Sequence, residues 1–227
     1  MQRYRERMPG RFDARSPQDL ADLIAGHPLA WVCSQGPGGL VATLLPLLPE
    51  WGADGRLVAL EGHFPRAHAQ AAALRADPHA LLLWLGPQSY VSPSWLDDRT
   101  QAPSWIYASA QCQVRVHFDD AEGAIEAHLR RLCAVHEAGR PQAWSPDEMG
   151  SRLRALAARV VPFRAEVIAV QPRFKLSQDE RDDVYASQLA QLAGGTLADW
   201  MRRFNPGRGP DATVNDPTNA DAVQRPT

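Results

Sequence analysis

An alternation of apolar and polar side chains runs from residue 106 to residue 118 and limits the possible folds more than any other feature of the sequence. The apolar positions are Ile106, Ala108, Ala110, Cys112, Val114, Val116 and Phe118. Successive side chains of a β-strand point to opposite faces of a sheet, so a period of two predicts a long strand with one buried face. The fold must therefore contain a sheet that covers a core on one side.

Further strands and helices are predicted on both sides of this strand. The other strand segments are 29–33, 40–48, 56–61, 80–85 and 163–170, and a glycine-rich turn joins the first two as a hairpin. The helix segments are 17–26, 67–76, a stretch capped by Asp119 or Asp120, 145–160 and 184–192. Six strands linked mostly by hairpins, with helices at the periphery, predict an α+β protein built on a six-stranded antiparallel β-barrel.

The chain is expected to form one domain over residues 1–195, followed by a C-terminal helix at 196–204. Its apolar fraction of 44% and charged fraction of 22% are those of an ordinary globular protein. Residues 205–227 are dominated by Pro, Gly, Asp, Asn and Thr, so burial of apolar side chains cannot offset the entropy of ordering them. We expect this segment to be a disordered tail.

Charge and cysteine content argue against several classes of function. The formal net charge is −2 and the basic residues are scattered, so no general attraction to nucleic acid phosphates is expected. Cys33, Cys112 and Cys133 form no C-x-x-C pair, which argues against a disulfide framework or a structural zinc site. No apolar run approaches the roughly 20 residues of a spanning helix. We therefore expect a cytoplasmic protein with no metal site and no membrane contact.

The segment 61–66 carries the first candidate binding residues. Arg66 precedes an alanine-rich helix, where a guanidinium beside free backbone N–H groups suits a phosphate. An ordinary solvated arginine explains the same position. His63 is either a ligand-binding residue or a hydrogen-bonded structural histidine, and spacing alone does not decide between them.

Two later segments, 86–95 and 174–178, combine polar groups with aromatic rings. Ser92 and Trp95 belong to a proline-rich loop, and Trp105 follows closely, so a flat heteroaromatic ligand has donors and rings to meet. Packing in a core or a dimer interface explains the same aromatics equally well. Lys175 and Gln178 add a cation and an amide suited to phosphate or to ring carbonyls. No dinucleotide-binding, P-loop, hydrolase or zinc-protease motif is present, and no catalytic residue can be named.

Taken in order, four segments resemble the PaiB-like FMN-binding negative transcriptional regulators: His63–Arg66, Gly86–Trp95, Pro103–Tyr107 and Lys175–Gln178. The resemblance implies a split barrel related to pyridoxamine 5'-phosphate oxidases, a homodimer, and FMN held in clefts between subunits. It also implies that Arg66 meets the phosphate, that Ser92 and Trp95 line the cleft, and that Lys175 and Gln178 close it. His63 and Trp105 are the remaining candidates for contact with the cofactor.

Three positions depart from that family's pattern, namely Ile106, His68 and Asp179. An apolar Ile106 cannot replace an amide hydrogen bond, and Asp179 adds negative charge near a phosphate, so FMN binding is expected to be weaker. The main prediction is an FMN-binding protein with a regulatory or modest flavin redox role. The alternative is a split-barrel interaction protein that has lost FMN or binds another ligand; direct DNA binding has no support from the charge.

Overall fold

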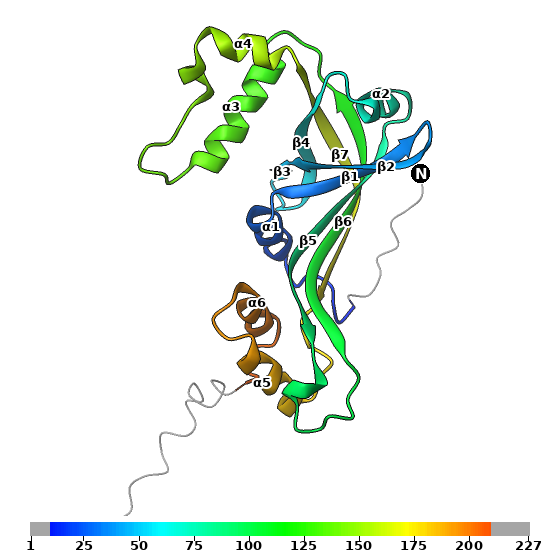
Figure 1. The fold of residues 1–227 in the computed structure, drawn as a ribbon, viewed down its shortest axis with the longest axis vertical. Coiled ribbons are helices and arrows are strands. Elements are labelled where there is room, and N and C mark those ends of the chain that lie inside the picture. The colour runs from blue at the N-terminus through cyan, green and yellow to red at the C-terminus, as the bar shows by residue number, and fades with distance from the viewer. Residues whose placement is uncertain (1–9, 210–227) are drawn as a thin grey trace, which may run out of the picture. The chain divides into compact units, whose positions relative to one another are not determined.

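The structure, a computed structural model, describes residues 10–209 and contains a seven-stranded antiparallel sheet with six α-helices (Figure 1). The strands are β1 (Leu29–Gly36), β2 (Gly39–Pro46), β3 (Leu48–Trp51), β4 (Leu57–Pro65), β5 (His79–Val91), β6 (Ser104–Phe118) and β7 (Val160–Lys175). The helices are α1 (Pro17–Gly26), α2 (Ala69–Ala76), α3 (Ala124–Glu137), α4 (Ser151–Ala157), α5 (Asp182–Gln191) and α6 (Thr196–Phe204), with short 3-10 helices η1 (Pro93–Trp95) and η2 (Pro146–Met149). The strand order is β2-β1-β5-β6-β7-β4-β3. The predicted α+β class is confirmed, with seven strands in place of six.

The additional strand arises because the apolar run 40–48 divides at Leu47. Residues up to Pro46 pair with β1, and Leu48–Trp51 form β3, which pairs with β4. Leu47 lies between the two strands, and its N–H donates to the carbonyl of Pro28, the residue before β1, at 3.0 Å. A strand predicted as continuous is therefore two strands at opposite edges of the sheet.

Two compact units divide the described chain. The larger unit comprises residues 16–85 and 109–172, and the smaller unit comprises residues 10–15, 86–108 and 173–209. In the larger unit, Phe64, Phe118 and Phe163 form an aromatic cluster with ring centroids 5.3–6.3 Å apart. Helix α1 buries Leu20, Leu23 and Ile24, as its apolar spacing predicts.

A second aromatic cluster forms the core of the smaller unit. The Phe174 ring stacks on Trp200 at 5.3 Å and on Phe204 at 4.8 Å between centroids, so α6 packs on the end of β7. Asn205 donates to the carbonyls of Leu176 and Met201, each at 2.8 Å. The predicted disordered tail begins at Asn205, and most of it, residues 210–227, lies outside the described residues.

Two predicted helix boundaries are wrong for local reasons. Helix α3 starts after Gly123, and Asp119 and Asp120 lie before it instead of capping it. The predicted helix 145–160 is interrupted at Gly150, whose φ of 55° and ψ of −131° are incompatible with a helix and unfavourable for other residues. Among residues 10–209, no helix combines the length and apolar character needed to cross a membrane.

Candidate functional site

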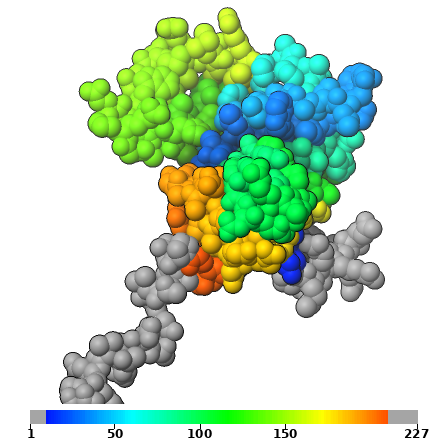
Figure 2. Space-filling view, turned by 60° about the horizontal axis from the view of Figure 1, so that its bottom comes forward, coloured from blue at the N-terminus to red at the C-terminus, as the bar shows by residue number. Residues whose placement is uncertain are grey.

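The seven predicted binding residues are divided between the two units. His63 and Arg66 lie in the larger unit, and Ser92, Trp95, Trp105, Lys175 and Gln178 lie in the smaller unit. Within the smaller unit, Trp105 lies on β6, and Ser92 directly precedes η1, which contains Trp95. Lys175 ends β7, and Gln178 lies in the turn that follows. Figure 2 shows segment 86–108 (green) beside the orange helices of the same unit. Each unit is therefore described separately below.

An exposed aromatic pair marks the surface of the smaller unit. Trp105 is 53% exposed and Tyr90 is 44% exposed, and their rings meet edge to face with centroids 5.9 Å apart. On the neighbouring strand β7, Lys175 Nζ donates to Ser104 Oγ at 2.7 Å. The two half-exposed rings offer stacking to a flat ligand, and Lys175 on the adjacent strand adds a cation to the same unit. Tyr90 lies in strand β5, so the predicted loop 86–95 is wrong as far as Val91.

Ser92, Trp95 and Gln178 occupy short structural turns. Ser92 Oγ accepts from the Ser94 N–H at 3.2 Å and so caps η1, which contains Trp95. Gln178 Oε1 accepts from Leu176 N–H at 2.7 Å, and its Nε2 donates to the Phe174 carbonyl at 2.6 Å. Both ends of the Gln178 amide are therefore engaged by the backbone of its own turn.

Arg66 is held by several groups at the end of β4. Its Nη1 lies 3.0 Å from Asp120 Oδ1, and its Nη2 donates to the Val160 carbonyl at 3.1 Å. Arg75 binds the same carboxylate at 2.8 Å, and the two guanidiniums, Arg75 foremost, lower the pKa of Asp120. Arg66 and Arg75 together carry one charge more than the carboxylate that they share, which favours an anion beside them.

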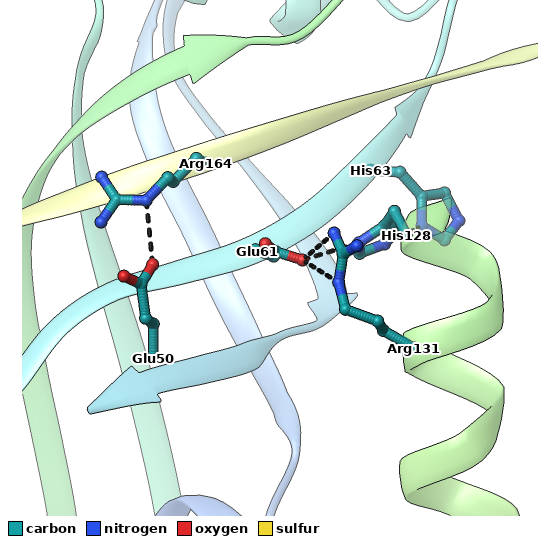
Figure 3. Close-up of polar contacts among 6 residues, drawn as sticks. All are labelled: Glu50, Glu61, His63, His128, Arg131 and Arg164. Carbon is teal, nitrogen blue, oxygen red and sulfur yellow. Dashed lines mark hydrogen bonds and ion pairs between the residues drawn. The ribbon is translucent and has the colours of Figure 1, made fainter. Parts of the chain in front are cut away.

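His63 lies against a second histidine that the sequence did not indicate. His63 Nδ1 is 3.1 Å from Nε2 of His128 on α3, and the two rings meet edge to face (Figure 3). His128 is 1% exposed. Burial, followed by the charge of His128, lowers the pKa of His63 to about 4, and burial also lowers the pKa of His128. Both imidazoles are therefore neutral at pH 7.

A carboxylate and an arginine continue this contact. Glu61 Oε2 lies 3.5 Å from His128 Nδ1 and accepts from Arg131 Nη2 at 2.7 Å (Figure 3). Arg131, Glu61, His128 and His63 form a hydrogen-bonded chain, which we call the histidine relay. The residues come from β4 and α3 and are up to 70 positions apart, so no local sequence pattern could have connected them.

Comparison with known proteins defines the class of this fold. The chain superposes on conserved hypothetical protein Rv2991 from Mycobacterium tuberculosis with a TM-score of 0.56, at 12% identity, covering 77% of this chain and 94% of that one. For the FAD and heme binding protein from Mycobacterium smegmatis the TM-score is 0.54, at 20% identity, covering 81% and 80%. Together with the antiparallel sheet and its peripheral helices, these likenesses identify an α+β split barrel, as predicted.

The family follows from the sequence match. Residues 7–169 match the family described as "Putative FMN-binding domain", and the chain belongs to that family. It is also 25% identical over 190 residues to "Protease synthase and sporulation protein PAI 2" of Bacillus subtilis (strain 168), covering 82% of this chain and 88% of that protein. The predicted membership of the PaiB-like FMN-binding family is thereby confirmed.

Proposed function

We propose that this chain is a cytoplasmic flavin-binding regulatory protein and that FMN is its ligand. The observation that carries the proposal is the exposed Trp105–Tyr90 pair, a surface suited to a flat ring system, in the unit that also contains Lys175. Support comes from the family description and from the similarity to a sporulation protein of Bacillus subtilis. A structural neighbour, from Mycobacterium smegmatis, is described as binding FAD. The flavin would supply any electron chemistry, and the protein would position it.

The side chains present fit such a ligand. In the smaller unit, Trp105 and Lys175 are the proposed contacts for a ring system. In the larger unit, Arg66 with Arg75 is the proposed contact for a phosphate. Ser92, Trp95, Gln178 and His63 complete the proposed set of contacts. Two of the departures from the family pattern have local roles: Ile106 is 3% exposed, within the core, and His68 caps α2 by accepting from the Gln70 N–H. Asp179 is exposed, where water screens its charge.

The first test is a visible spectrum of freshly purified protein followed by titration with FMN. We expect flavin absorption bands and saturable binding, and we expect Trp105→Ala to raise the Kd about tenfold, because ring stacking contributes about 1–3 kcal/mol. Trp144→Ala is the matched control, since Trp144 is also exposed but lies in the larger unit. Absence of binding up to about millimolar FMN would end the proposal.

A second prediction concerns the phosphate. Arg66→Ala should weaken FMN binding about tenfold and riboflavin binding much less, because only FMN carries the phosphate that a guanidinium pairs with. Isothermal titration of both ligands against the wild type and the variant measures the difference. Equal losses for the two ligands would show that Arg66 acts through the fold, by its contacts with Asp120 and Val160, and not through the phosphate.

We also propose a homodimer formed through an uncharged apolar strip on β1, β2 and β5. Trp31 is paired with Leu44 and Leu83 on the adjacent strands, and Trp31 and Leu44 are 49% and 43% exposed. The strip continues with Leu29 and Leu85, which are 50% and 63% exposed. A second copy of the same strip covers it without desolvating a charge, which makes an identical chain the best-matched partner.

Sedimentation of a strip variant tests this dimer. Trp31→Lys should weaken self-association at least about tenfold, because it places a charge in an apolar contact. Val135→Lys is the control, since Val135 is an equally exposed apolar residue of the larger unit that lies on α3, outside the strip. A wild type that sediments as a monomer, or a Trp31 variant that dimerises as tightly as the wild type, contradicts the proposal.

A second candidate function has its own observation. Arg66 is paired with Asp120, and the Gln178 amide is satisfied by its own turn, so two of the proposed contacts already have protein partners. This favours a split-barrel regulatory protein that binds another ligand, or none, and acts through protein partners. The FMN titration separates the two candidates, because only the first requires saturable flavin binding.

A further inference from the structure

The histidine relay fixes which nitrogen of His63 carries its proton. Glu61, as a carboxylate paired with Arg131, can only accept hydrogen bonds, so the proton of His128 lies on Nδ1, the nitrogen that faces Glu61. A neutral imidazole has one N–H, which leaves Nε2 of His128 as an acceptor. The 3.1 Å contact with His63 then requires that His63 donate from Nδ1.

The other ring nitrogen of His63, Nε2, consequently carries no proton. Among the described residues, no side chain or backbone group hydrogen-bonds His63 Nε2. Nor is this nitrogen a buried atom left without a partner. It is therefore open to solvent and presents a lone pair. In neutral histidine the proton ordinarily prefers Nε2, so the relay holds His63 in the less common form.

We infer that His128 and Glu61 are positioning residues that make His63 Nε2 an acceptor for a hydroxyl or N–H group of the bound ligand. A lone pair repels a phosphate or carboxylate oxygen, so His63 does not contact the anionic end of the ligand. In the proposed flavin, on which this ligand assignment rests, the matching groups are the ribityl hydroxyls and the ring N–H. Within the larger unit, Arg66 would thus pair with an anionic group of the ligand, and His63 would accept a hydrogen bond from an uncharged one.

Nitrogen-15 NMR of the histidine rings in the full-length protein at neutral pH tests the tautomer directly. We expect His63 Nε2 to show the shift of an unprotonated ring nitrogen and Nδ1 that of a protonated one, with His63→Gln identifying the signals. In His128→Phe, which removes the acceptor and keeps a ring, His63 should change to the Nε2-protonated form. His136→Phe is the matched control, because His136 is an exposed histidine on the same helix.

Two outcomes overturn the inference: Nε2 protonated in the wild type, or His63 unchanged in His128→Phe. If His128→Phe does not fold, Glu61→Gln replaces it, and the single tautomer should become a mixture because an amide can donate as well as accept. In titrations, His128→Phe should weaken FMN and riboflavin equally, by about two- to tenfold. Unchanged affinities overturn the ligand assignment, whereas a protein that binds no flavin refutes the proposed function and leaves the tautomer result standing.

Discussion

Replacement of Gly62 by alanine is expected to lower the free energy of unfolding by about 3 kcal/mol, the upper range for inserting a methyl group into a packed core. Gly62 is buried on β4 between Glu61 and His63. A Cβ atom there would lie 2.6 Å from Phe163 Cζ and 2.7 Å from Leu47 Cδ2. Relief of that overlap requires movement of an aromatic ring of the Phe64–Phe118–Phe163 cluster.

Urea unfolding followed by circular dichroism measures this effect, with Gly26→Ala as the matched control. A Cβ atom at Gly26 meets nothing within 4 Å, and Gly26 ends helix α1. Alanine there should leave stability unchanged or raise it by up to about 1 kcal/mol, since it favours the helix. A Gly62→Ala protein as stable as the Gly26→Ala protein would contradict the close packing of Phe163 and Leu47 against Gly62.

Local chemistry explains which parts of the fold were predicted correctly. Helix α1 has a proline at its first position, and Asp19 accepts from the Ser16 N–H at 2.9 Å. These groups lie within four consecutive residues, so the sequence alone shows them together. The strand 106–118 was recognisable because its alternation needs no knowledge of its neighbours; β6 extends it by two residues to Ser104. The division of 40–48 into two strands was not predictable, because it depends on pairing with β1 and β4.

The candidate site was only partly predictable for the same reason. The resemblance to a family identified Trp105 and Lys175 through short motifs, and these two side chains lie on adjacent strands. It also identified His63, but not the partner that determines its chemistry. His128 follows His63 by 65 positions and is oriented by helix α3, so its role appears only when β4 and α3 are packed together.

Acidification should destabilise the larger unit through the same two histidines. Burial holds the folded-state pKa of His63 at about 4, against 6.5 for an ordinary histidine, and the pKa of His128 is lowered too. Between those pH values the unfolded chain binds more protons than the folded chain, so stability falls as the pH drops from about 6.5 toward 4. Because water reaches part of the His63 ring, we expect a loss on the order of 2 kcal/mol.

Urea unfolding at pH 7 and near pH 4.5 measures this loss, and the double variant His63→Gln, His128→Phe should remove most of it. Burial lowers the pKa of His27 in the same direction, so a smaller pH dependence should persist in the double variant. Arg131 and Glu61 face His128 with opposite charges, Glu61 raising its pKa and Arg131 lowering it, and the burial of the ring outweighs both. If the double variant loses as much stability in acid as the wild type, the two imidazoles are not held neutral by the fold.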